Sequence, residues 1–83
     1  MKIGVIGAGR LGICFALLAE SAGHDVYVSD VRPSYVAQIN AREIFSNEPD
    51  VEELLMESKH LRATTNNQDV IKSSDVIFTF VPT

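Results

Sequence analysis

The 83-residue sequence contains a single cysteine, few basic residues and no long apolar run. One cysteine, Cys14, excludes an internal disulfide and is typical of a reducing compartment. Seven basic and 11 acidic side chains give a net charge of −4, which together with the lack of a basic stripe argues against a nucleic-acid partner. The longest apolar stretch, residues 13–19, is shorter than the roughly 20 residues that cross a bilayer. The sequence therefore predicts a cytoplasmic globular domain with no membrane partner.

Two further features of the composition point to structure rather than chemistry. Cys14 lies in an apolar segment, so we expect it to be an inert core residue. Five carboxylates lie close together in the second half of the chain, but their spacing fits the first turn and charged face of a solvated helix. We predict no metal site from this acidic group, which comprises Glu48, Asp50, Glu52, Glu53 and Glu57.

Strand-like and helix-like segments alternate along the chain. Short β-branched or apolar runs predict strands over residues 2–6, 25–30, 61–64 and 75–81, and the density of the last run predicts burial on both faces. Helices are predicted over residues 11–23, apolar on nearly every side, then from Pro33, from Pro49, and from a Thr65 cap to Lys72. This alternation predicts an α/β fold, a Rossmann-type doubly wound parallel sheet whose first four strands lie in the order 3-2-1-4.

Three glycines, Gly7, Gly9 and Gly12, have the spacing G-x-G-x-x-G. The motif follows a predicted strand and opens a predicted helix, and Asp30 ends the next strand, as a dinucleotide-binding loop requires. Gly7 would allow a tight turn, Gly9 would let a pyrophosphate approach the backbone, and Gly12 would let the helix pack close to the strand. The alternative is that the glycines serve only a tight strand–helix turn.

The residues around this motif indicate which dinucleotide would bind. A carboxylate at Asp30 would accept hydrogen bonds from ribose hydroxyls and repel a 2′-phosphate, so NAD is favoured over NADP, unless Asp30 is only a turn residue. Arg32 could bind a 2′-phosphate, stack on adenine or lie in solvent. Arg10 either reaches a phosphate or points into water, and Leu11 completes the predicted cofactor-binding loop.

Six segments in the same order and spacing resemble the UDP-glucose/GDP-mannose dehydrogenase family: MKIGVIGAGRLG, GHDVYVSDVRP, INA, EPDVEELL, LRATTN and SSDVIFTFVPT. The resemblance covers essentially the whole chain. The glycine motif is shared by many dehydrogenases, whereas residues 48–55, 61–65 and 81–83 are more specific to this family. The chain departs from the family at Arg10, where an aromatic residue is usual, at Asp50-Val51, where Gly-Leu is usual, and in the loop REIFSN. These departures bear on the substrate more than on the cofactor.

The resemblance implies that residues 1–83 are the N-terminal part of an NAD-binding domain in a longer, homo-oligomeric enzyme. Such enzymes oxidise the C6 alcohol of a UDP- or GDP-sugar to the carboxylate by two hydride transfers to NAD, through a thiohemiacetal on a catalytic cysteine. The resemblance places that cysteine and its partners beyond residue 83, and places Val81 and Thr83 at the cofactor. Two alternatives remain: another β-hydroxyacid or 3-hydroxyacyl-CoA dehydrogenase, and a non-catalytic nucleotide-binding module.

Overall fold

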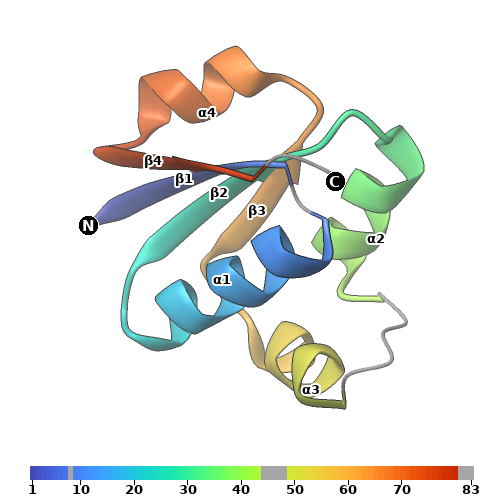
Figure 1. Cartoon of the computed structure of the whole chain (residues 1–83). Helices are drawn as coiled ribbons and strands as arrows, with labels where there is room; N and C mark the ends of the chain where they lie inside the picture. Colours follow the sequence, from blue (N-terminus) through green and yellow to red (C-terminus); the bar gives the residue numbers. More distant parts are fainter. Residues whose placement is uncertain (8, 44–48, 81–83) are drawn as a thin grey trace.

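Four strands and four helices alternate along the chain in a computed structural model that describes residues 1–7, 9–43 and 49–80, without the side chains of residues 10 and 49–52. Figure 1 shows the elements in order: β1 (Lys2–Ile6), α1 (Arg10–Ser21), β2 (Asp25–Ser29), α2 (Pro33–Ala41), α3 (Pro49–Glu57), β3 (Leu61–Thr64), α4 (Asn67–Ser73) and β4 (Val76–Thr79).

The strands form one parallel sheet in the order β3-β2-β1-β4, which confirms the predicted topology. In the register of the sheet, Ile3 of β1 lies opposite Val26 of β2 and Val76 of β4. Helices α1 and α2 pack on one side of this sheet, α3 packs against α1 on that same side, and α4 packs on the other side of the sheet (Figure 1). All the strands therefore present their carboxyl ends at one edge of the sheet.

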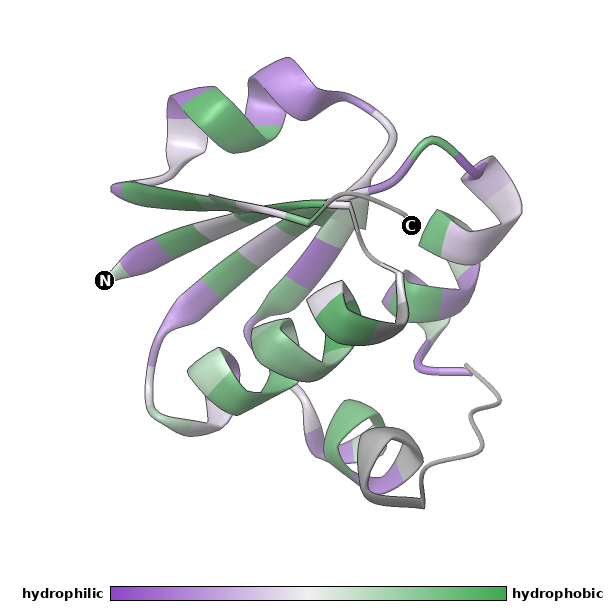
Figure 2. Cartoon of the chain, in the orientation of Figure 1, coloured by the Kyte–Doolittle hydropathy of each residue, from purple (hydrophilic) through white to green (hydrophobic). Residues whose placement is uncertain are grey.

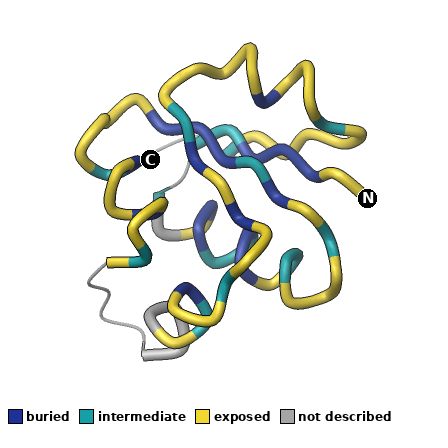
Figure 3. Tube along the Cα trace, turned by 180° about the vertical axis from the view of Figure 1, so that it is seen from behind, coloured by how far each residue is buried: buried dark blue, intermediate teal, exposed yellow. Residues whose placement is uncertain are grey.

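The core lies between the sheet and α1, α2 and α3. Alternate strand residues point into it, because successive side chains of a strand face opposite sides. Figure 2 shows the green, apolar bands of the strands and helices that meet there, and Figure 3 shows the buried centre of the sheet from behind. The fully buried side chains of this core include Val5, Leu17, Val28, Ile39 and Leu55.

Helix α1 differs from the prediction of a helix wedged between layers. Leu11 is 73% exposed and Leu18 is 62% exposed, whereas Ile13, Ala16 and Leu17 are buried. The helix packs against the sheet and against α3, and its remaining side faces solvent. Although α1 has apolar residues on nearly every side, one side of the helix is exposed to solvent.

The start of α4 also differs from the predicted Thr65 cap. The N-cap is Asn66, whose side-chain oxygen accepts a 2.9 Å hydrogen bond from the backbone N–H of Gln68. The hydroxyl of Thr64 in turn accepts from the backbone N–H of Asn66 at 3.1 Å. The short Asn side chain reaches the free N–H groups of the first turn one residue later than the capping-box spacing indicated.

Gly4, in the middle of β1, allows α4 to lie close to the sheet. A Cβ at this position would come within 2.7 Å of Cγ1 of Val70, which is fully buried, and would also meet the Ser74 side chain. A glycine inside a strand marks such a close approach. We expect Gly4→Val to push α4 off the sheet and to lower the free energy of unfolding by about 3 kcal/mol.

Chemical denaturation of Gly4→Val checks this expectation, with Gly9→Ala as the matched control. A Cβ at Gly9 meets no atom of the described residues within 4 Å, apart from its chain neighbours, so the free energy of unfolding of Gly9→Ala should stay within about 1 kcal/mol of the parent's. Equal stability of the two variants would show that α4 does not depend on the missing side chain at Gly4.

The two outer strands of the sheet, β3 and β4, differ in how their free sides are covered. On the β3 edge, the side chain of Asn40 in α2 accepts from the N–H of Ala63 at 2.9 Å and donates to its C=O at 3.0 Å, as a neighbouring strand would. On the other edge, β4 pairs with β1, and its residues Val76, Ile77 and Phe78 are 37–39% exposed. The prediction that β4 is buried on both faces is therefore wrong for this chain, because β4 is an edge strand.

We expect the 83-residue polypeptide to self-associate through β4, because an exposed apolar edge strand is a template for pairing with another chain. Ile77→Lys should suppress the association, since a charged residue on an edge strand disfavours pairing. Light scattering over a concentration series compares the parent and the variant. A parent that stays monomeric at high micromolar concentration contradicts this expectation.

Candidate functional site

The carboxyl edge of the sheet is where the predicted site residues come together. Three backbone hydrogen bonds hold the strand ends in place: Gly7 N–H to the Ser29 carbonyl at 2.9 Å, Asp30 N–H to the Thr64 carbonyl at 3.0 Å, and Phe80 N–H to the Ile6 carbonyl at 2.8 Å. In open parallel sheets, ligands bind outside the carboxyl ends of the strands, where the strand order reverses. Here that reversal lies at β1, between β2 and β4.

Gly7 and Gly12 shape the turn that leaves β1. Gly7 has a φ of 94°, a conformation that L side chains rarely adopt, and a Cβ there would collide with the Phe80 carbonyl oxygen. A Cβ at Gly12 would collide with the Gly7 carbonyl oxygen and lie 3.6 Å from Cγ1 of Val5. The structure thus confirms the predicted tight turn at Gly7 and the predicted close packing of the helix at Gly12.

Gly9 differs from the other two glycines, because a Cβ at this residue would meet no atom of the described residues within 4 Å, apart from its chain neighbours. Its φ of −64° is open to any residue, so neither backbone strain nor packing requires glycine here. Gly9 is the N-cap of α1, a 12-residue helix whose first N–H groups carry partial positive charge. The open space beside Gly9 and the helix terminus together fit the pyrophosphate of a dinucleotide.

Asp30 and Arg32 form a closely bonded pair just beyond β2. Asp30 is 8% exposed, and its Oδ1 accepts from both the backbone N–H and the Nε of Arg32 at 2.9 Å. Its Oδ2 accepts from Nη2 of Arg32 at 3.1 Å. The side chain of Arg32 is 56% exposed. The carboxylate predicted to bind ribose is therefore at the expected edge of the sheet, engaged by the neighbouring guanidinium.

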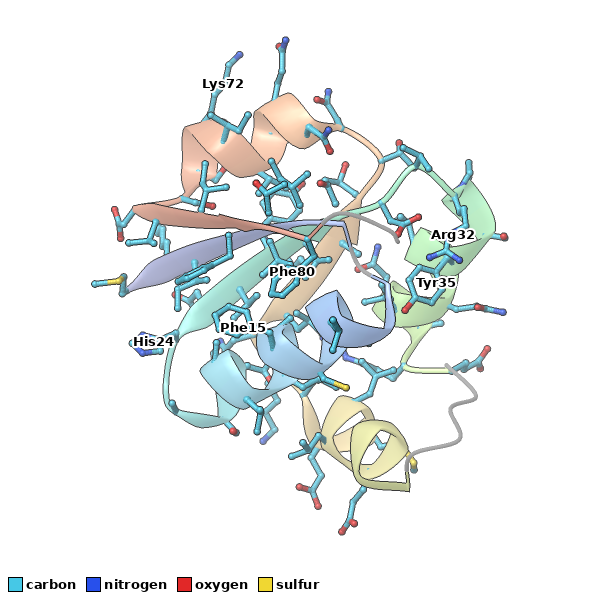
Figure 4. All side chains as sticks on the ribbon, in the orientation of Figure 1. Phe15, His24, Arg32, Tyr35, Lys72 and Phe80 are labelled. Atoms are coloured by element: carbon cyan, nitrogen blue, oxygen red, sulfur yellow. The ribbon has the colours of Figure 1, made fainter. Side chains whose placement is uncertain are left out.

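Tyr35, in the first turn of α2, completes this cluster, and sequence reasoning missed it. The guanidinium carbon of Arg32 lies 4.3 Å from the centre of the Tyr35 ring, and Figure 4 shows the two side chains next to each other at the start of α2. The hydrogen bonds to Asp30 raise the pKa of the Arg32 guanidinium, and burial raises the pKa of the Tyr35 phenol. Arg32 therefore stays charged at physiological pH while it lies between a carboxylate and an aromatic face.

The other predicted site residues stand as follows. Leu11, in the first turn of α1, is exposed beside the glycine loop. Arg10 is the first residue of α1, but its side chain, like residues Val81 and Thr83, lies outside what the structure describes. Cys14 is half-buried and packs against the core, so it is less covered than predicted.

The opposite edge of the sheet, where the strands begin, contains a hollow of about 390 Å³, lined by Lys2, Asp25, His60, Arg62 and Ser74 among others. The strands begin here and helices α1 and α4 end here, so the helix dipoles direct partial negative charge to this edge. Its lining contains three basic side chains, Lys2, Lys59 and Arg62, and one acidic side chain, Asp25, whose carboxylate lies 3.4 Å from Nδ1 of His60. The glycine loop and the N-terminus of α1 lie at the other end of the sheet, where the strands end.

Among the described residues, no group of three or more His, Cys, Asp or Glu side chains is placed to hold a metal ion. In that same part of the chain, no helix is long and apolar enough to span a bilayer.

The sequence profile of the UDP-glucose/GDP-mannose dehydrogenase family, NAD binding domain, matches residues 1–83. The chain belongs to this family. The match spans every segment on which the sequence resemblance rested, so the family assignment is confirmed. The four-stranded parallel sheet and its glycine loop agree with an NAD-binding domain.

Individual relatives agree with the family. A GDP-mannose dehydrogenase structure from Pseudomonas aeruginosa superposes with a TM-score of 0.93 at 31% identity, covering 100% of this chain and 20% of that one. The UDP-N-acetyl-D-mannosamine dehydrogenase of Pyrococcus horikoshii is 31% identical, over 100% of this chain and 20% of that protein. Glycerol-3-phosphate dehydrogenase [NAD(P)+] of Lactiplantibacillus plantarum is 35% identical, over 99% of this chain and 23% of that protein. The chain thus spans about a fifth of the length of these relatives.

Proposed function

We propose that this chain is the NAD-binding part of a nucleotide-sugar dehydrogenase that oxidises the C6 alcohol of a UDP- or GDP-sugar to the carboxylate by two hydride transfers. The observation that carries the cofactor assignment is the open space at Gly9 between two glycines that packing does require. A position where the protein itself does not need glycine, at the N-terminus of a helix, is explained by a ligand that approaches the backbone there.

In this proposal, the residues of the chain bind and orient the dinucleotide. The backbone of Gly9 and the first N–H groups of α1, at Arg10 and Leu11, receive the pyrophosphate. Gly7 and Gly12 hold that loop against β1 and β4. Asp30 accepts from the ribose hydroxyls, and Val81 and Thr83 keep the cofactor contact that the family resemblance implies for them. When bound, NAD supplies the hydride acceptor for oxidation of the sugar alcohol.

None of the residues in this chain is assigned a role in covalent catalysis. Cys14, its one cysteine, lies in α1 and packs against the core rather than in the glycine loop. We therefore assign the catalytic groups to residues outside this chain, and we propose that the full-length enzyme binds a nucleotide sugar and is a homo-oligomer. The proposed setting is the cytoplasm, where nucleotide sugars and NAD are available.

A second candidate is oxidation of a small phosphorylated alcohol, which the identity to glycerol-3-phosphate dehydrogenase favours. The proposed function predicts that the complete reading frame encoding this chain reduces NAD with UDP-glucose, GDP-mannose or UDP-N-acetylmannosamine. A panel of these sugars and glycerol 3-phosphate, followed by NADH absorbance, separates the two. Turnover of glycerol 3-phosphate with none of the sugars would overturn the proposed substrate class.

A further inference from the structure

We propose that the hollow at the edge where the strands begin is a binding site for a doubly charged phosphate group, either inorganic phosphate or a phosphate monoester. The hollow lies at the opposite end of the sheet from the glycine loop, so this inference does not depend on the proposed cofactor function. Its volume of about 390 Å³ is in the range of small-molecule pockets.

Positive charge is concentrated at this hollow in a protein that is acidic as a whole. The chain contains 7 lysine and arginine residues against 11 carboxylates. Among the described residues, Lys2, Lys59 and Arg62 nevertheless line the hollow together with one acidic residue, Asp25. The Asp25 carboxylate is already engaged, since it lies 3.4 Å from Nδ1 of His60. The lining therefore has an excess of positive charge, which attracts an anion.

The charges of Lys2, Lys59 and Arg62 are not used inside the described part of the protein. None of these three side chains makes a hydrogen bond or an ion pair with another described residue. By contrast, Arg32 is paired with a carboxylate, and Arg42 donates to three backbone carbonyls at 2.7–3.3 Å. Unpaired like charges around one hollow repel one another, and a bound dianion would offset this repulsion.

Arg62 is placed to be the main anchor of the site. It lies opposite Tyr27 in the register of β2 and β3, and its guanidinium carbon is over the Tyr27 ring, 4.6 Å from the ring centre. Stacking uses the face of the guanidinium, so the N–H groups at its edge stay available to a ligand. These N–H groups form a planar fork that matches two oxygens of a phosphate. Lys2 in β1 and Lys59, just before β3, add charge from two other segments.

The helices that end at this edge do not cancel its positive charge. Backbone N–H groups of Ala22, Gly23 and His24 bond to the last carbonyls of α1 at 2.9–3.3 Å. In α4, the hydroxyls of Ser73 and Ser74 donate to carbonyls one turn earlier, at 2.8 and 2.6 Å. Unbonded carbonyls at a helix end amount to only about half a negative charge. Three basic side chains therefore outweigh these helix ends.

Two further carboxylates lie near the hollow, and both are bonded to backbone groups. Asp75 accepts from the backbone N–H of Lys2 at 3.0 Å. Glu20 accepts from the backbone N–H of His60 and from the hydroxyl of Ser58, each at 2.6 Å. Neither of these acidic residues lines the hollow. The side-chain cations of the hollow thus stay available to a ligand.

The charge of the ligand distinguishes this site from the glycine loop. A phosphate or phosphate monoester carries close to two negative charges at neutral pH, because its second pKa is about 6. Each phosphorus of a dinucleotide's pyrophosphate is esterified on both sides and carries one. The loop at Gly9 offers the N–H groups of a helix terminus, whereas the hollow offers side-chain cations. We therefore expect NAD to bind at the loop and a doubly charged phosphate to bind at the hollow.

Titration of inorganic phosphate and of methyl phosphate into the ¹⁵N-labelled protein tests this site, at an ionic strength held constant with sodium chloride. We expect saturable shifts of the amides of Lys59, His60 and Arg62, with a dissociation constant for inorganic phosphate of about 1 mM. Arg62→Gln should raise this constant about tenfold, the size of one charge-assisted contact. Lys72→Gln is the matched control, since it removes the same charge from the outer side of α4, away from the hollow (Figure 4), and should leave the constant unchanged.

Saturation by inorganic phosphate alone supports the inference with the free ion as the ligand, and saturation by both probes supports it with a phosphate monoester. Shifts at the hollow that do not saturate by about 20 mM phosphate overturn the inference. An Arg62→Gln variant that binds as tightly as the parent also overturns it. Phosphate shifts confined to Gly9 and Leu11 overturn it as well, and leave the proposed NAD site intact.

Discussion

Replacing Gly9 by valine should abolish NAD binding while the domain stays folded. Beyond its chain neighbours, a Cβ at Gly9 meets no atom within 4 Å in the part of the chain that the structure describes, so the substitution should change the free energy of unfolding by about 1 kcal/mol or less. The added side chain would instead occupy the space that the pyrophosphate needs at the start of α1. We expect the affinity for NAD to fall about a hundredfold or more, through loss of the phosphate contacts at the helix terminus.

Gly12→Val is the control that separates binding from folding. At Gly12 a Cβ collides with the Gly7 carbonyl oxygen inside the same motif, so this variant should lose about 3 kcal/mol of stability or fail to fold. Calorimetry for binding and thermal unfolding for stability distinguish the two variants. If Gly9→Val binds NAD as tightly as the parent does, the phosphates of NAD do not bind at this loop.

Replacing Asp30 by alanine should narrow the difference in affinity between NAD and NADP. The variant removes the acceptor for the ribose hydroxyls and the charge that repels a 2′-phosphate, and it frees Arg32 from its bonds to the carboxylate. We expect NAD binding to weaken about tenfold to a hundredfold, while NADP binding stays level or improves. Calorimetric titration of both dinucleotides measures the change.

Asp30→Asn is the conservative companion of this variant. It keeps the shape of the side chain and an oxygen that can accept from the Arg32 backbone N–H, which Asp30 now does at 2.9 Å. The start of α2 should therefore stay intact, while the negative charge is lost and discrimination falls. Equal affinity of the unaltered protein for NAD and NADP would contradict the role of Asp30 as the discriminating residue.

The sheet could be predicted from the sequence because its strands follow simple rules. The runs 2–6 and 61–64 are strands in the structure, and Val26 and Val28 lie on one buried face of β2 as their alternation predicts. Pro33 begins α2, and Gly23, with a φ of 101°, follows the end of α1. These features depend on local backbone preferences, so they can be recognised from a few neighbouring residues.

The wrong predictions, on the burial of β4 and of α1, concern the surroundings of these elements. Phe78 belongs to a strand as apolar as a central one, but its exposure depends on which segment pairs beyond β4, which the run itself does not encode. Leu18 lies in an apolar helix, and only the packing of α1 shows that this side faces solvent. The role of Gly4 did have a signal in the sequence, since a glycine within a strand indicates that another element packs closely against it.

The candidate site shows the same division. The spacing of Gly7, Gly9 and Gly12 predicted the loop, and the structure separates the two glycines that packing requires from the one that it does not. The pair of Asp30 and Arg32 could not be predicted, because a long arginine side chain has several possible partners within reach of one backbone position. The position of the Arg32 guanidinium depends on the Tyr35 ring, which the first turn of α2 places beside it.

Titration of NAD into the ¹⁵N-labelled protein, followed by amide chemical shifts, tests the central claim most directly. We expect the largest shifts at Gly7, Gly9, Leu11, Asp30 and Arg32, which all lie at the carboxyl edge of the sheet. The amides that line the hollow at the opposite edge, at Lys59, His60, Arg62 and Ser74, should stay unchanged. Shifts confined to that opposite edge, or none at either edge at saturating NAD, would contradict it.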